Sequence, residues 1–464
     1  MGVEDYRSLR SLGLEDWGLM EELRSFRISD IVPEDVERVM EGIRRGGFDV
    51  WLVGGALRDL LGGWTIEDWD LATDARPHEI VDLFPRVIPV GIRHGTVQVQ
   101  TRKRGIEVTT CPAPGSRGIL EDLARRDFTV NALALSYPEG RLLDPHAGER
   151  DLKSGILRAV GNASTRFKED PLRTLRACRF VSAHGFRIDG NTFKAMRAEA
   201  QGLKRVAGER IRQEIFKLLP GKWVLDAFES MRCGGVLQEV LPELLEGYGV
   251  TDESCGVRDL YEHIVFTVHY CASRLRPRLA ALFHNMAKAG IGKEAPAGPG
   301  FESHGGGAAP IAVQVLMRWR ASHKEIRDVV ALTENHLSPQ IHAWTDRAVR
   351  ELIVRVGPEL LDDLLDLARA DRLSCKASEE SLGEIEALRL QIESQLTQGF
   401  PFTIRDMAVN GQDVMRLLNT VPGPHIGRIL RKLHRKVIED PKLNDRRILL
   451  DFIHKEFSGN VREG

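Results

Sequence analysis

The chain has 464 residues, 42% of them apolar, and its 65 Lys or Arg against 67 Asp or Glu give a formal net charge of -2. This composition is typical of a globular protein of about three or four units and excludes a strongly basic, histone-like binder, although nucleic acid can still bind a local basic surface. No apolar run approaches the ~18 residues of a membrane span, and the N-terminus carries acids where a signal peptide is basic. The six cysteines form no CxxC. We therefore expect a cytoplasmic protein without a membrane segment or a disulfide scaffold.

The pattern of apolar, β-branched, Gly and Pro residues changes along the chain and predicts an α+β N-terminal domain followed by helices only. Residues 1–45 carry apolar residues at helical spacing and form a predicted helical N-terminal extension. Residues 46–160 contain short β-branched runs separated by Gly and Pro, which are typical of a small mixed β-sheet with helices. Three predicted all-α segments follow, at 161–250, 251–395 and 396–464.

Two glycines and two acids flank the first helix of the predicted sheet domain. Gly54 and Gly55 follow an apolar strand and open a helix, so the backbone can approach a phosphate, to which Arg58 would add a bidentate contact. Asp68 and Asp70 are two residues apart and, on a strand, point to the same side. Paired carboxylates of this kind suit Mg²⁺. We therefore predict a nucleotide site here, with Asp68 and Asp70 as catalytic residues and metal ligands.

Each half of this pattern also has a simpler interpretation. A GG pair alone is usually a turn, and a DxD pair alone is usually a set of solvated charges at a strand edge. The combination around one helix favours the site. Glu107, in the later run GIEVTT, is equally consistent with a third carboxylate and with a residue that orients its neighbours.

Further motifs follow in order and carry a resemblance to a known family. They read RRDFT at 125–129, DPHAG at 144–148, EDPLR at 169–173 and ERIR at 209–212. Together with the GG and DxD motifs they resemble the class II tRNA nucleotidyltransferases and the bacterial poly(A) polymerases, and the joint match is highly specific. The resemblance implies that a tRNA 3′-hydroxyl attacks the α-phosphate of a nucleoside triphosphate and expels pyrophosphate.

The resemblance also assigns expected roles to segments and residues. It implies that 46–160 is a nucleotidyltransferase head, or palm, that 161–250 is a neck that recognises the nucleotide base, and that 396–464 is a tail that contacts tRNA. By the same comparison, nucleotide contacts are expected at the sugar or phosphates from Arg126, Asp127, Arg176 and Arg179.

Asp170 and Arg173 are the expected base-recognition pair. We place them three residues apart on one predicted helix, hence adjacent. A carboxylate can accept from the amine of cytosine and a guanidinium can donate to its N3 and O2, so the pair would act as a template for the base. The alternative is an ordinary surface salt bridge. The motifs upstream favour base recognition.

Two features bear on which family member this chain resembles. The GxxHGT pattern within 90–96 looks like the tRNA enzymes and not like the poly(A) polymerases. Only ten residues, 111–120, connect the EVTT strand to EDLARRDFT, where CCA-adding enzymes carry a long loop that this family associates with the switch from CTP to ATP. We therefore expect a CC-adding enzyme that uses CTP and leaves the terminal A to a separate A-adding enzyme. The alternatives are complete CCA addition with CTP and ATP and, less well supported, poly(A) synthesis.

The segment 251–395 contains a region that resembles the HD phosphohydrolases. The His-Asp dyad that binds metal in that family reads His284-Asn285 here, and asparagine is a poor metal anchor. Remnants of such a site would be His263, His304 and Asp371. We therefore expect a degenerate, HD-like body that holds tRNA, and the alternative from a different functional class is an HD-type phosphohydrolase.

Overall fold

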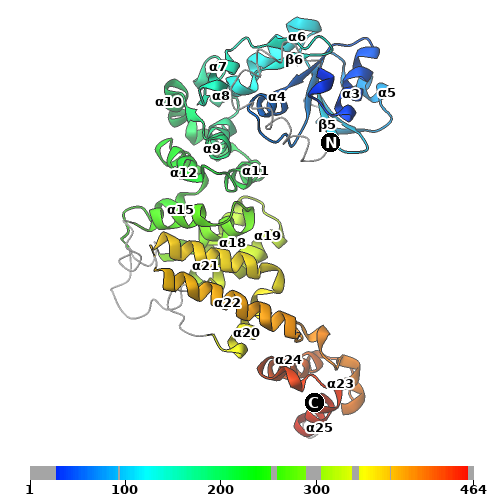
Figure 1. The fold of residues 1–464 in the computed structure, drawn as a ribbon, viewed down its shortest axis with the longest axis vertical. Coiled ribbons are helices and arrows are strands. Elements are labelled where there is room, and N and C mark those ends of the chain that lie inside the picture. Colours follow the sequence, from blue (N-terminus) through cyan, green and yellow to red (C-terminus); the bar gives the residue numbers. More distant parts are fainter. Residues whose placement is uncertain are drawn as a thin grey trace. The chain divides into compact units, whose positions relative to one another are not determined.

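The computed structural model describes residues 28–91, 95–251, 259–288, 305–336, 344–376 and 378–457. The chain divides into two compact units. Figure 1 shows its helices and strands coloured along the sequence. Unit 1 comprises Met1–Val206 with Gly221–Val240, and unit 2 comprises Ala207–Pro220 with Leu241–Gly464. No helix in the described part is long and apolar enough to cross a membrane.

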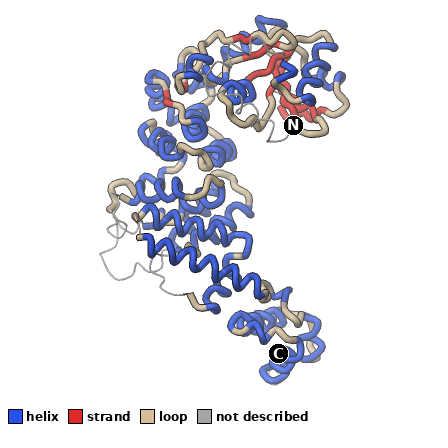
Figure 2. The backbone as a smooth tube through the Cα atoms, in the orientation of Figure 1, coloured by secondary structure: helices blue, strands red, loops and turns tan. Residues whose placement is uncertain are grey.

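A seven-stranded mixed sheet forms the centre of unit 1. Its strand order is β3-β4-β5-β2-β1-β6-β7, in which β2 and β5 are parallel and the other neighbours are antiparallel. A separate parallel pair joins β8 to β9. All strands in the described residues lie in this unit (Figure 2). The strands are β1 (Val50–Val53), β2 (Asp70–Thr73), β3 (Val87–Gly91), β4 (Thr96–Gln100), β5 (Gly105–Thr110), β6 (Ala134–Ser136), β7 (Leu142–Leu143), β8 (Ile156–Leu157) and β9 (Arg187–Ile188).

Helices of unit 1 surround the sheet and continue beyond it. Their apolar faces follow helical spacing, as in α3, where Val36, Val39, Met40 and Ile43 are buried. The α-helices are α3 (Glu34–Arg45), α4 (Gly54–Leu61), α5 (Pro77–Leu83), α6 (Gly115–Arg125), α7 (Gly148–Lys153), α8 (Ala163–Glu169), α9 (Leu172–His184), α10 (Gly190–Glu199), α12 (Val224–Cys233) and α13 (Val236–Val240). The 3-10 helices are η1 (Ile28–Asp30), η3 (Thr129–Asn131) and η4 (Ala200–Arg205).

All the regular elements in the described residues of unit 2 are helices. Its α-helices are α11 (Gly208–Leu218), α14 (Pro242–Leu245), α15 (Leu260–Tyr270), α16 (Leu275–Phe283), α18 (Gly305–Arg318), α19 (His323–Glu334), α20 (Asp346–Val356), α21 (Leu361–Ser374), α22 (Glu379–Gln398), α23 (Gly411–Leu418), α24 (Pro424–Glu439) and α25 (Arg446–Phe457). Its 3-10 helices are η5 (Pro358–Leu360), η6 (Ile404–Asp406) and η7 (Pro441–Leu443). The helices α23, α24 and α25 share a small apolar core around Val414, Leu433 and Leu449.

The predicted fold class, an α+β head followed by helices, is confirmed. The unit boundary falls inside the predicted neck, 161–250, because α11 and the residues from Leu241 onward belong to unit 2. Part of the predicted extension, 1–27, lies outside the described residues, as do Ile92, Arg93 and His94 of the GxxHGT pattern.

Candidate active site in the sheet-containing unit

The turn between β1 and α4 brings the backbone against the side chains of the candidate site. The strand is buried along its whole length and ends at Val53, and Gly54 opens the helix with a φ of 67°. A Cβ at Gly54 would lie 2.7 Å from Nη1 of Arg126 and 3.2 Å from Oδ2 of Asp70. Glycine fits this position because the φ is left-handed and because there is no room for a side chain. The next N–H, that of Gly55, donates a hydrogen bond to Asp70.

Three acidic side chains lie beside this turn. Asp70 begins β2 and pairs in register with Glu107 on the parallel strand β5, so both side chains leave the same face of the sheet. Asp68 is exposed, whereas Trp69 between the two aspartates is buried. Burial raises the pKa of Asp70, Arg126 opposes that rise, and the carboxylate of Asp68 adds to it. Hard oxygen donors gathered on one side of the chain fit a divalent cation such as Mg²⁺.

Two arginines near these acids are held by the protein itself. The Nε and Nη2 atoms of Arg58 hydrogen-bond to Asp59 at 2.8 Å, and its Nη1 donates to Oδ1 of Asn131 at 2.7 Å. Arg126 donates from Nε and Nη2 to Asp122 at 3.0 and 2.9 Å, and from Nη1 to the backbone oxygen of Asn131 at 3.4 Å. Both guanidinium groups are therefore fixed in place, with Asn131 as their common partner.

Asp127 is the buried centre of a second charged group. Its Oδ2 accepts from Nε and Nη2 of Arg176 at 2.9 and 2.7 Å, and its Oδ1 accepts from the Phe128 N–H and from Asn131. Burial alone would raise the pKa of this carboxyl, but Arg176 and the hydrogen bonds prevail and hold the pKa well below its usual range. Asp127 is thus ionised and positions Arg176 on α9.

Three guanidinium groups surround one aromatic ring. The Cζ atoms of Arg179, Arg58 and Arg176 lie 4.3, 4.9 and 5.8 Å from the ring centroid of Phe180. His184 stacks on the same ring, and burial together with Arg58 and Arg179 lowers its pKa to about 3, so it is neutral and adds no charge. Cations collected on an aromatic face suit an anionic partner such as a polyphosphate.

Asp170 and Arg173 lie at the junction between α8 and α9 and not on one helix. Asp170 is extended, with φ -143° and ψ 98°, and Pro171 follows it before α9 begins. The prediction that both residues lie on one helix is therefore wrong, although the Arg173 N–H donates to the backbone oxygen of Asp170 at 3.1 Å. The guanidinium of Arg173 contacts Glu169 at 3.3 Å and donates to the backbone oxygen of Arg125 at 2.9 Å. That second contact ties the junction to the RRDFT motif.

All the predicted site residues lie in unit 1. The structure brings the turn glycines, Asp70 and Arg126 together. It also pairs Asp127 with Arg176 and places Arg58, Arg176 and Arg179 over the ring of Phe180. The sequence did not identify Asp59, Asn131 or Phe180 as members of the site. Asn131 offered one signal, because it is a polar residue in the otherwise apolar run that follows RRDFT. Phe180 offered none, since it falls on the apolar face of a helix.

The connection between β5 and α6 is short and is held at both ends. The Cys111 N–H donates to the backbone oxygen of Thr73 at 2.7 Å, and the Gly115 N–H donates to Oδ2 of Asp74 at 3.2 Å. The hydroxyl of Thr110 donates to the backbone oxygen of Ala75 at 2.7 Å. The first residues after β5 are therefore tied to the segment that follows β2.

Comparisons with known proteins agree on one family. Residues 50–158 match the poly(A) polymerase head domain, residues 185–247 match the RNA and SrmB-binding site of polymerase A, and residues 309–453 match tRNA nucleotidyltransferase domain 2. A CCA-adding enzyme of Bacillus cereus is 30% identical over 431 residues, which cover 90% of this chain and 97% of that protein. One of Leuconostoc citreum is also 30% identical, over 86% of this chain and 91% of its own.

Solved structures give the same result. The crystal structure of the Bacillus stearothermophilus CCA-adding enzyme in complex with CTP has a TM-score of 0.68 and 27% identity, and the match covers 91% of this chain and 96% of that one. A Thermotoga maritima CCA-adding enzyme complexed with tRNA, at 21% identity and a TM-score of 0.54, shares the fold over 94% of this chain and 98% of its own.

Proposed function

This chain belongs to the family of tRNA nucleotidyltransferases that contains the CCA-adding enzymes, and we propose that it builds the CCA end of tRNA from CTP and ATP. The observation that carries the proposal is the Gly54 turn, which brings backbone N–H groups, the carboxylates of Asp68 and Asp70, and Arg126 into one place. Nucleotidyltransferases of this family use divalent metal ions. In this chain the proposed ion is Mg²⁺, held by Asp68 and Asp70, with Glu107 as a third acid.

The proposed reaction joins the tRNA 3′-oxygen to the α-phosphorus of the nucleotide and releases pyrophosphate. Bound Mg²⁺ supplies a lower pKa for the attacking hydroxyl and a counter-charge for the phosphates. The side chains of this protein bind and orient the triphosphate. The glycine turn allows the backbone to approach it, and Arg126, Arg176 and Arg179 offset its charge from positions that Asp122, Asp127 and Phe180 fix.

Recognition of the base is proposed for the junction between α8 and α9. The Leu172 N–H donates to Oδ1 of Asp170 at 3.3 Å, which orients that carboxylate. Arg173 is oriented by Glu169 and by the backbone oxygen of Arg125. A carboxylate acceptor and a guanidinium donor oriented in this way can meet the amine and the N3/O2 edge of cytosine.

Complete CCA addition is supported better by the relatives than the CC addition expected from the sequence, because the named relatives are CCA-adding enzymes. CC addition stays the second candidate because of one observation, the tied connection after β5. A template that must change from cytosine to adenine needs freedom near the base, and this connection offers little. In that case a separate enzyme would add the terminal A.

The experiment uses a tRNA transcript that lacks its last three nucleotides. The purified protein is incubated with CTP and ATP together, with each alone, and with UTP, and the 3′ ends are sequenced. Ends in CCA support the main proposal, and ends that stop at CC support the second candidate. Runs of A would indicate poly(A) synthesis, and unextended ends would contradict both proposals.

A further inference from the structure

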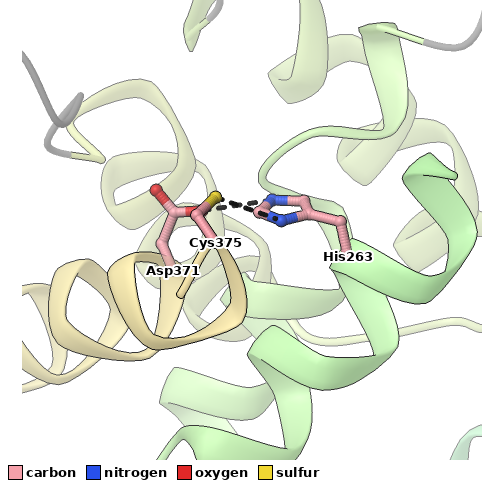
Figure 3. Close-up of side chains that lie close together, drawn as sticks. All are labelled: His263, Asp371 and Cys375. Carbon is pink, nitrogen blue, oxygen red and sulfur yellow. Dashed lines mark hydrogen bonds and ion pairs between the residues drawn. The ribbon is translucent and has the colours of Figure 1, made fainter. Parts of the chain in front are cut away.

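Unit 2 contains a cluster of buried polar side chains that the proposed reaction does not use. His263 lies on α15, His284 and Asn285 follow α16, and Asp371 lies on α21. The exposed fractions of these residues are 0%, 0%, 3% and 5%. The close-up in Figure 3 shows His263 facing Asp371 and Cys375 from the opposite helix. Such a group needs a physical account, because buried polar atoms are costly without partners.

Three lone-pair atoms of this cluster converge on one point. Nε2 of His263 lies 3.1 Å from Nε2 of His284 and 3.1 Å from Oδ1 of Asp371. Nε2 of His284 lies 3.3 Å from the same carboxylate oxygen. Each of these separations is short enough to require either a proton or a cation between the two atoms.

The contacts of the two Nδ1 atoms indicate where the hydrogen of each neutral imidazole lies. Nδ1 of His284 lies 2.6 Å from the backbone oxygen of Ala281, and a carbonyl can only accept, so this nitrogen carries the hydrogen. The hydroxyl of Ser374 donates to the backbone oxygen of Asp371 at 2.7 Å, so at 2.9 Å it accepts from Nδ1 of His263. In the neutral rings, both Nε2 atoms then face the centre as bare lone pairs.

Asn285 supplies a fourth atom. Its amide nitrogen lies 2.9 Å from Nε2 of His263, while its Oδ1 is buried without a hydrogen-bond partner. The oxygen and nitrogen of a carboxamide have nearly the same shape, and a half-turn about the last bond exchanges them. After that turn the oxygen faces the centre as a fourth ligand atom, and the amide nitrogen takes the former position of the oxygen.

We propose that His263, His284, Asn285 and Asp371 bind one divalent transition metal ion of the zinc class. Ligand atoms at ~2.0–2.1 Å from a tetrahedral ion lie about 3.3–3.4 Å from one another, close to the separations found here. Metal-binding histidines typically donate their other N–H to a carbonyl or a similar acceptor, as both rings do. This inference is independent of the proposed tRNA chemistry.

The burial of the site makes it structural and not hydrolytic. All four ligands are enclosed, so the ion has no open position for a substrate, and it links α15, α16 and α21. The sulfur of Cys375 is not a ligand, because it is part of a disulfide and lies 3.7 Å from Nδ1 of His263, on the side of the ring that faces away from the centre.

The first test measures the metal content of the full chain. Protein purified without chelator, in buffer with Mg²⁺, is incubated with Zn²⁺, separated from free metal and analysed by plasma mass spectrometry and native mass spectrometry. We expect about one zinc per chain in the wild type and in the matched control His323→Ala, whose histidine is exposed in the same unit. The variants His263→Gln and His284→Gln should lose that ion. A wild type without bound zinc, or equal zinc in all four proteins, would overturn the proposal.

The second test keeps the proposal falsifiable if the histidine variants fail to fold. Asn285→Asp adds a charged ligand, so it should bind zinc more tightly and melt at a higher temperature with zinc than with chelator. If protons and no metal occupy the centre, the new carboxylate beside Asp371 lowers the melting temperature under both conditions, which contradicts the proposal. Ser374→Ala removes an outer partner and should lower zinc affinity about 10–100-fold in chelator competition; unchanged affinity would contradict it.

Discussion

Replacing Arg176 with alanine tests how the buried carboxylate of Asp127 is stabilised. Asp127 is only 7% exposed, and its Oδ2 has Arg176 as donor through Nε and Nη2, whereas the other donors reach Oδ1. Hydrogen bonds to a charged group contribute about 1.5–3 kcal/mol, and removing one partner of a buried pair costs up to about 3–5 kcal/mol. Water can partly replace Arg176, whose side chain is 32% exposed. We therefore expect a loss of about 2–3 kcal/mol for Arg176→Ala and about half of that for Arg176→Lys.

The depressed pKa of Asp127 predicts how the stability lost in the variant changes with pH. The folded pKa of Asp127 is depressed, so the stability that the pair contributes is fully present above the unfolded pKa, about 3.9, and is lost as the pH falls through the folded value. Without Arg176, burial raises the pKa of the carboxyl. The stability difference between wild type and variant should therefore be largest at pH 7 and shrink on acidification.

The assay is urea unfolding followed by hydrogen exchange on peptides of each unit. Peptides from α9 and the central strands should report the loss, and peptides from unit 2 serve as an internal control in the same sample. A difference below about 0.5 kcal/mol at pH 7, or a difference that grows as the pH falls, would refute the reasoning.

Three further substitutions test the nucleotide site. Asp170→Ala should lower selectivity for CTP over UTP by about ten- to a hundredfold in competition assays, because a base contact contributes ~1–3 kcal/mol of discrimination; unchanged selectivity would return Asp170 to a structural role. Gly54→Ala should lower the free energy of unfolding by about 1–2 kcal/mol and depress kcat, because its Cβ meets Arg126 in a left-handed turn, and a fully active variant would disprove that contact. Phe180→Leu keeps an apolar side chain but removes the ring under three guanidinium groups, so KM for CTP should rise more than kcat falls, which steady-state kinetics would show; a change in kcat alone would contradict it.

The sequence predicted the parts of the site that depend on residue type and short spacing. The glycine turn after a buried strand and the acids around Trp69 follow from local chemistry, and the structure has both. The position of Asp170 outside a helix also follows from the sequence. A residue before proline is biased away from the helical region, so Pro171 already indicated that Asp170 lies outside α9.

Other features depend on tertiary contacts that no local pattern contains. Asn131 hydrogen-bonds to Arg58, Arg126 and Asp127, which lie on separate segments. The ring of Phe180 contacts arginine side chains from two helices. In the body, the replacement of an acid by Asn285 suggested a lost metal site. Only the structure shows which acceptors face the outer nitrogens of the two rings and which amide oxygen has no partner.

The most direct test of the central claim compares the wild type with Asp70→Asn in one measurement. Each protein is incubated with α-labelled CTP, Mg²⁺ and a tRNA transcript that lacks its CCA end, and label in the tRNA is counted alongside binding of the same tRNA. We predict rapid labelling by the wild type, and for Asp70→Asn a loss of labelling with tRNA affinity within about twofold. Labelling by the variant at the wild-type rate under saturating Mg²⁺ would contradict the assignment of the active site, and no labelling by either protein would contradict the proposed function.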